Sequence, residues 1–193
     1  MAFPPNRFIV IHLIMASDLP ELRSSRLLLR RPLQEDVEAR LSLGQHKEII
    51  EAYGGSFDPA TSFTRAHAEA AIRFIENQEQ AWVIDAGGFI GHIRLHSLAL
   101  QDRRAALAIG IESPAYLGKG YGGEAIRLVL AYAFEGGLHR VSLRVLASNP
   151  RAIICYRKCG FIEEGREREA AFVGGAWQDD IIMGLLDREF VSR

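Results

Sequence analysis

The chain has 193 residues, of which 48% are hydrophobic and 24% charged, and its net charge is −1. This length allows one domain with a full core, and the composition is typical of globular proteins. The near-neutral charge gives no broad basic surface for nucleic acid or an anionic membrane, and no apolar run approaches the ~20 residues of a membrane span. We therefore expect neither a nucleic-acid nor a membrane partner.

The first feature along the chain is an apolar run at residues 8–15 that contains His12. No small-residue cleavage site follows it, which disfavours a secretory signal peptide. The alternatives are an additional N-terminal strand or a natural start at Met15. We interpret residues 1–21 as an N-terminal extension and residues 22–193 as a single domain, and we expect a cytoplasmic location.

Alternating and helical spacing predict the elements of the first half. They are a strand at 26–31, helices at 34–43 and 63–77, and a hairpin of strands at 81–85 and 89–95. The second helix is expected to bury Ala66, Ala70 and Phe74, which follow helical spacing. Gly54 and Gly55 mark a loop between the two helices.

The next strand, at residues 104–112, has two very different faces. The bulky face is Leu107, Ile109 and Ile111, and the nearly bare face is Ala106, Ala108 and Gly110. A bare face either receives a helix or leaves room for a thin ligand along the strand, and the sequence leaves both open.

A glycine-rich turn then leads directly into an amphipathic helix. Its residues are Leu117, Gly118, Lys119, Gly120, Tyr121, Gly122 and Gly123. Glycines permit backbone angles that aim several N–H groups at one point, and the helix adds free amides and its positive dipole end. This combination predicts a seat for a phosphate or pyrophosphate.

Two other phosphate-binding motifs fit poorly. The spacing of Gly118, Gly120 and Gly123 matches a dinucleotide fingerprint, but residues 140–145 lack the required acidic residue and repeated βαβ units are absent. A P-loop is excluded because Gly120 follows Lys119 where Ser or Thr is needed, and Ser113 stands where its first glycine should be.

The remaining elements predict a sheet that is mostly antiparallel, with one parallel strand–helix–strand unit. They are a helix ended by Gly136 and Gly137, a strand at 141–145, a helix at 149–159, and strands at 161–164 and 181–186 around a loop with Gly174 and Gly175. Cys155 and Cys159 lie one helical turn apart without a metal-binding quartet, so we interpret them as reduced thiols and expect no metal.

These motifs together resemble the GNAT N-acetyltransferase superfamily, and more narrowly its branch of ribosomal-protein N-terminal acetyltransferases. The matching segments are residues 26–30, 117–125, 137–145, 149–161, 164–165 and 180–185. The resemblance spans about residues 22–190. It implies an α/β (α+β) fold with a mixed, mostly antiparallel, twisted sheet of six to seven strands, about four flanking helices and a splayed strand pair that holds acetyl-CoA.

The resemblance also assigns site residues. The cofactor is expected to contact the glycine-rich turn (Leu117 to Gly123), Ile109, Ile111, Asn149 and Arg151. Tyr156 matches the general acid, and a phenol with a pKa of ~10 can protonate a departing thiolate at neutral pH. Three of these residues have an alternative role. Tyr156 would pack between helix and sheet, Asn149 would cap a helix, and Lys119 would be a solvated loop charge.

The base that deprotonates the attacking amine is less well defined. Glu112 is the candidate, against the alternative of a solvated charge at a strand end, while His92 and His96 share a strand face and are expected to be structural. Two residues depart from the branch. Leu117 stands where Gln or Arg is frequent, in a cradle that acts mainly through its backbone, and Ala106 stands where an acid is frequent, which indicates a different acceptor side.

The expected activity is direct acetyl transfer to a primary amine, with a protein or peptide N-terminus as the acceptor. An antibiotic or polyamine is one alternative, for which Glu51, Asp58 and Glu69 could attract a cation, and a non-catalytic acyl-CoA-binding module is another. A homodimer is an open alternative for the oligomeric state.

Overall fold

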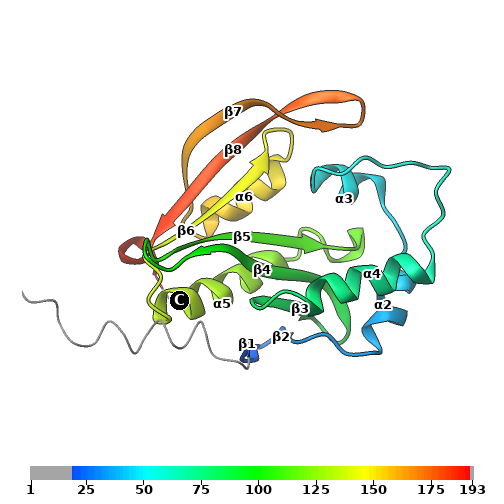
Figure 1. The fold of residues 1–193 in the computed structure, drawn as a ribbon, viewed down its shortest axis with the longest axis horizontal. Coiled ribbons are helices and arrows are strands. Elements are labelled where there is room, and N and C mark those ends of the chain that lie inside the picture. Colours follow the sequence, from blue (N-terminus) through cyan, green and yellow to red (C-terminus); the bar gives the residue numbers. More distant parts are fainter. Residues whose placement is uncertain (1–18, 192–193) are drawn as a thin grey trace, which may run out of the picture.

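The computed structural model describes residues 19–191, in which one sheet is flanked by helices on both faces (Figure 1). The strand order is β1-β2-β3-β4-β5-β6-β8-β7. The strands are β1 (Leu22–Arg23), β2 (Leu28–Arg30), β3 (Ala81–Asp85), β4 (Phe89–Ala99), β5 (Arg104–Ile111), β6 (Arg140–Leu146), β7 (Ile162–Val173) and β8 (Ala176–Leu186). The described helices are α2 (Asp36–Leu43), α3 (Lys47–Ala52), α4 (Arg65–Glu76), α5 (Tyr121–Glu135) and α6 (Pro150–Lys158), with short 3₁₀ turns at Pro114–Tyr116 and Asp187–Glu189.

The predicted architecture is confirmed, because β5 and β6 form the parallel pair of the sheet and the other neighbours are antiparallel. The described part has one strand and one helix more than the sequence predicted, namely β1 and α3. Both are too short to show a periodic pattern, since β1 has 2 residues and α3 has 6.

Helix α4 packs on a different face from the predicted one. Its buried side chains are Ala68, Ile72 and Ile75, while Ala66 and Ala70 are exposed and Phe74 is 43% exposed. The row Ala68, Ile72 and Ile75 and the row Ala66, Ala70 and Phe74 both follow helical spacing, so the sequence pattern is compatible with burial of either row. The contact of α4 with β3 and α2 decides between them.

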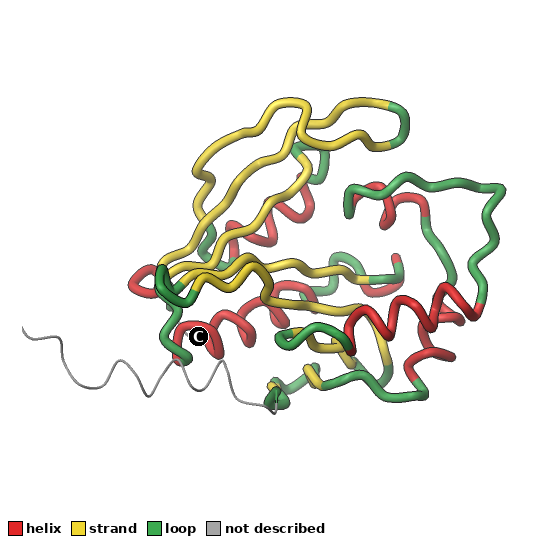
Figure 2. Tube along the Cα trace, in the orientation of Figure 1, coloured by secondary structure: helices red, strands yellow, loops and turns green. Residues whose placement is uncertain are grey.

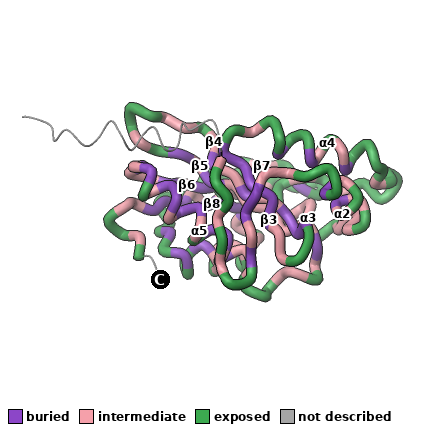
Figure 3. Tube along the Cα trace, turned by 90° about the horizontal axis from the view of Figure 1, so that it is seen from below, coloured by how far each residue is buried: buried purple, intermediate pink, exposed green. Residues whose placement is uncertain are grey.

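Two hydrophobic cores lie on opposite faces of the sheet. Along β3, Trp82 and Ile84 join the larger core with α5 and α6, whereas Ala81 and Val83 join a smaller core with α2 and α4. Figure 3 shows that burial concentrates in the central strands and that much of the β7–β8 hairpin is exposed. The central strands are therefore packed on both faces, so residues at their ends are held in fixed positions.

The parallel pair β5–β6 separates soon after it begins. Pairing runs from Arg104 with Arg140 to Ala106 with Ser142, and the rest of β5 has no partner on that side while β6 continues along β8. Figure 2 shows the strands converging at one end and fanning out toward the other. The splayed pair expected from the resemblance is thus present.

The apolar run at residues 8–15 lies outside the described residues, and β1 begins at Leu22, where the single domain was expected to start. Within residues 19–191, none of the helices combines the length and hydrophobicity that crossing a bilayer requires.

Candidate active site

A cavity of about 1290 Å³ occupies the opening between β5 and β6. It is bounded by these strands, by α3 and α6, and by the glycine-rich turn before α5. The predicted site residues that line it are Ile109, Ile111, Leu117, Gly118, Gly120, Tyr121, Gly122, Gly123, Asn149, Arg151 and Tyr156. Lys119 and Glu112 are the two predicted residues that do not line it.

The glycine-rich turn has the backbone geometry that anion binding needs. Gly118 and Gly120 have φ values of 74° and 88°, in the left-handed region that favours glycine. Gly120 is the N-cap of α5 and provides no side-chain cap, so within the described chain no side chain caps the amides of this first turn. These donors at the positive end of a 15-residue helix are suited to a phosphate or diphosphate group.

An ion pair that the sequence analysis missed braces this turn from the N-terminal segment. Arg26 donates from Nη1 to the Lys119 carbonyl oxygen at 3.1 Å and from Nε to Glu124 Oε2 at 2.9 Å. Ser24 also donates to Glu124, and the Arg26 guanidinium lies 5.0 Å from the centre of the Tyr121 ring. Arg26 and Glu124 are 98 positions apart, and no local pattern connects them.

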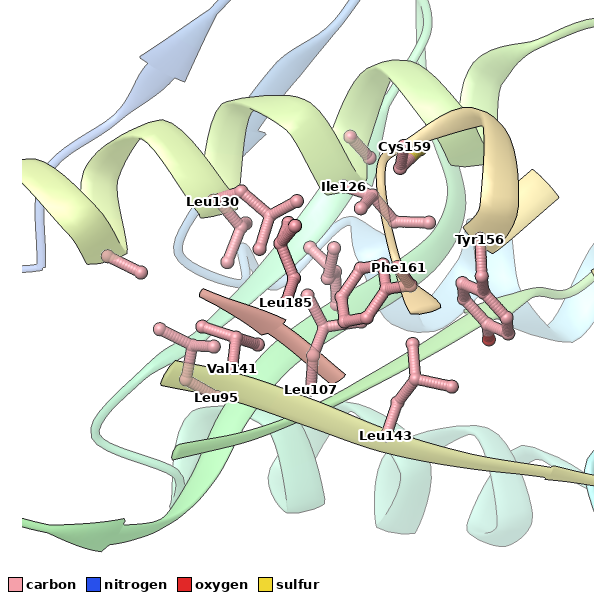
Figure 4. Close-up of a cluster of buried hydrophobic side chains, with 14 of the residues drawn as sticks. Leu95, Leu107, Ile126, Leu130, Val141, Leu143, Tyr156, Cys159, Phe161 and Leu185 are labelled. Atoms are coloured by element: carbon pink, nitrogen blue, oxygen red, sulfur yellow. The ribbon is translucent and has the colours of Figure 1, made fainter. Parts of the chain in front are cut away.

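Tyr156 comes from α6 and lies at the edge of the larger core, beside Phe161 (Figure 4). Its ring centre is 6.0 Å from that of Phe161, and the residue is 8% exposed. Burial, assisted by Cys155 and Tyr53, raises the pKa of Tyr156 well above its ordinary value. The phenol therefore stays protonated at neutral pH, and its packing role is compatible with proton donation into the cavity.

Asn149 caps α6 and also anchors α3. Its Oδ1 accepts a hydrogen bond from Ala152 N at 3.1 Å, and its Nδ2 donates to the Ala52 carbonyl oxygen at 3.2 Å. On the other side of α3, a Cβ added to Gly174 would lie 3.3 Å from Glu51 Oε1, so the turn of the β7–β8 hairpin packs against Glu51. Helix α3 is thereby held between α6 and the hairpin, across the cavity.

Glu112 is 19% exposed at its side chain and lies between His92 and Arg40. Its Oε1 lies 3.3 Å from His92 Nδ1, and its Oε2 lies 3.4 Å from Arg40 Nη2. Burial alone would raise the pKa of Glu112, but the hydrogen bond to His92 and the charges of His92 and Arg40 outweigh it and leave the pKa below its ordinary value. The carboxylate is therefore ionised at neutral pH.

The bare face of β5 forms one wall of the cavity. The register places His92, Arg94 and His96 of β4 opposite Gly110, Ala108 and Ala106. Burial and the charge of Arg94 lower the pKa of His96, so this imidazole is neutral near pH 7. The small side chains of β5 leave space beside Arg94, which sequence reasoning did not single out.

The two cysteines lie where α5 and α6 meet. Cys155 lines the cavity, and the buried Cys159 donates a weak hydrogen bond to the Gly123 carbonyl oxygen at 3.6 Å. A hydrogen bond from Cys159, opposed by burial and assisted by Arg127 and Lys158, lowers the pKa of Cys155 to about 7. Both are free thiols, and the described chain has no group of three or more His, Cys, Asp or Glu residues arranged to hold a metal.

A splayed parallel strand pair beside a glycine cradle at a helix N-terminus is the arrangement expected for an acyl-CoA-dependent acyltransferase. The model of the acetyltransferase (GNAT) domain matches residues 26–162. The chain therefore belongs to the GNAT acetyltransferase family, whose cosubstrate is acetyl-CoA.

Relatives and solved structures agree with this membership. The spermidine N(1)-acetyltransferase of Vibrio cholerae is 29% identical over 173 residues, which cover 88% of this chain and 98% of that protein. The Escherichia coli K12 spermidine N(1)-acetyltransferase is 31% identical over 61% of this chain and 63% of its own length. A crystal structure of the Vibrio cholerae enzyme with CoA and spermine superposes with a TM-score of 0.70 and 28% identity, covering 86% of this chain and 98% of that one.

Proposed function

We propose that this acetyltransferase modifies the primary amine of a small molecule by direct transfer. The position of α3 carries this proposal, because Ala52, Tyr53 and Gly54 border the cavity and the helix is tied to Asn149 and packed on Gly174. A cavity that is bordered by α3 in this way suits a small acceptor, whereas the N-terminus of a folded protein would need an open groove. A peptide N-terminus is thus the less favoured acceptor.

In the proposed reaction the amine nitrogen attacks the thioester carbonyl carbon of acetyl-CoA, and the carbon–sulfur bond then breaks. The departing thiolate of coenzyme A takes the hydroxyl proton of Tyr156. The nitrogen of the new amide releases its extra proton to solvent, and Tyr156 regains a proton from solvent. The diphosphate of coenzyme A occupies the amides from Gly118 to Gly123, with Asn149 and Arg151 along the rest of the cofactor. Ile109 and Ile111 border the thioester, where a backbone N–H would stabilise the developing oxyanion.

The ammonium form of the acceptor must lose a proton before it attacks. We propose Glu112 as the final proton acceptor, through His92 or water, because its carboxylate is ionised and in contact with His92. Lys119 remains a proposed phosphate contact, reached by rotation of its side chain from outside the cavity. Neither Cys155 nor Cys159 is needed as a nucleophile in direct transfer.

A polyamine is the second candidate acceptor, because the relatives that share most of their length with this chain include a spermidine N(1)-acetyltransferase. An acceptor panel with acetyl-CoA, read by release of the thiol of coenzyme A, tests both proposals. We expect turnover with a small primary amine and at least a tenfold lower kcat/KM with N-terminal peptides of proteins. Efficient turnover with those peptides alone would contradict the small-molecule assignment, and binding of CoA without any turnover would contradict catalysis.

A further inference from the structure

Arg94 lines the cavity, and among the described residues it forms no ion pair with a carboxylate. On the same side of the sheet, Arg144 pairs with Glu167 and with Asp180, the latter at 3.2 Å, and Arg40 pairs with Glu112. Among the described residues no carboxylate lies within ion-pair distance of Arg94, and its Nε is buried without a hydrogen-bond partner. Cations of this kind are normally paired when removed from water, which indicates a missing anion.

The guanidinium of Arg94 is held in place by its neighbours. Its central carbon lies 5.2 Å from the centre of the Phe74 ring, and it hydrogen bonds with the side chain of Tyr53. Neither partner carries a negative charge at neutral pH, since burial raises the pKa of Tyr53 above its ordinary value. The planar group is thus oriented but not neutralised, which favours binding of a carboxylate.

The position of Arg94 along the cavity wall places its charge close to where the acetyl group is transferred. Arg94 pairs with Ala108 and lines the cavity beside it. Ala108 precedes Gly110 by two residues, about 7 Å along a strand. An anion at Arg94 and an amine near Ile111 therefore lie within the span of one small molecule.

We propose that Arg94 receives a carboxylate of the acceptor, so that the acceptor is an amino acid or a similar amine that also carries a carboxylate. This inference rests on the proposed function and names the acceptor class of the same site. The acids that line the cavity, Glu167 and Asp180, already pair with Arg144, and Ala106 provides no further acid beside His96. A polyamine would bring two or more further positive charges next to an unpaired guanidinium, which opposes its binding.

The test compares amino acids with their amides, which keep the amine and lose the carboxylate. Rates of thiol release are measured for the wild type, Arg94→Gln and Arg94→Lys, with spermidine and N-terminal peptides in the same panel. Arg104→Gln is the matched control, because Arg104 lies on β5, is 61% exposed at its side chain and pairs with Asp102 outside the cavity. Calorimetric CoA affinity of each variant verifies that its fold and cofactor site are intact.

We expect the best amino acid to exceed its amide in kcat/KM by about 30-fold or more in the wild type, the effect of losing one partner of a buried charge pair. Arg94→Gln should remove this preference by slowing the acid alone, Arg94→Lys should keep part of it, and Arg104→Gln should behave as wild type. Equal rates with acids and amides, a preference for spermidine, or an unchanged preference in Arg94→Gln would overturn the inference while leaving the proposed function intact. CoA binding with no turnover of any amine would overturn both.

Discussion

Gly120 offers the sharpest test of the anion cradle, because its backbone conformation can be changed without altering the charge of the site. Its φ is 88°, and a Cβ built on it would lie 3.4 Å from Nη2 of Arg26, which is an ordinary van der Waals contact. In Gly120→Ala the left-handed conformation therefore costs about 1–2 kcal/mol, with little added by crowding. For a domain of this size the melting temperature should fall by about 2–8 °C.

Part of this strain is relieved if residue 120 changes to a negative φ, and the first amides of α5 then point away from the diphosphate. A hydrogen bond to a charged group contributes about 1.5–3 kcal/mol. Loss of one such bond should weaken CoA binding by about 10- to 100-fold.

Gly87→Ala is the matched control. Gly87 has a φ of 85°, an added Cβ would meet nothing within 4 Å, and the residue lies in the β3–β4 turn rather than at the cavity. Both variants should lose similar stability in a thermal melt, but calorimetry should detect weaker CoA binding in Gly120→Ala alone. Equal CoA affinity in the two variants would show that the turn before α5 does not hold the diphosphate.

Three further predictions concern ionisable side chains. Tyr156→Phe should lower kcat by about 100-fold or more with little change in KM in steady-state kinetics. Because the pKa of Tyr156 is raised, ionisation of this phenol should not reduce the activity of the wild type below pH ~10. Glu112→Gln should lose about 1–3 kcal/mol of stability at pH 7 in denaturant titrations. Since the folded-state pKa of Glu112 is depressed below 4.5, its contribution is present above that pH and lost as the pH falls through the folded value, so the two proteins should converge in acid. Alkylation of Cys155 by iodoacetamide should rise as the pH passes about 7 and slow with acetyl-CoA, as read by mass spectrometry with Cys155→Ser as the blank.

The elements that the sequence predicted well are those with a strong local signal. Asn149 and Pro150 mark the start of α6, Gly174 and Gly175 mark the hairpin turn, and each has that place in the structure. The buried face of α4 was wrong because that helix carries two apolar rows, and only its packing on β3 selects Ile72 and Ile75 over Phe74. Helix α3 was missed because six residues give too little periodicity to recognise.

The conformation of the glycine-rich turn was predictable for the same reason. Positive φ values at Gly118 and Gly120 depend on the glycines themselves, so their spacing alone predicts an anion site there. The brace from Arg26 to Glu124 could not be predicted, since it depends on a segment 98 residues away that folds back over the helix N-terminus.

The acceptor side depends on cross-strand register, and this explains why its charge was not visible in the sequence. The acids considered there, Glu51, Asp58 and Glu69, suggested attraction of a cation. In the fold, Glu51 lies near Lys47, at 3.9 Å, and Glu69 pairs with Arg65, whereas Asp58 bonds within its own loop. A single shift of β4 against β5 would turn Arg94 to the other face of the sheet. The placement of the Arg94 charge in the cavity wall is therefore a consequence of strand pairing. Acceptor choice in this family should be argued from the paired and unpaired charges of the folded cavity rather than from the number of acids along the chain.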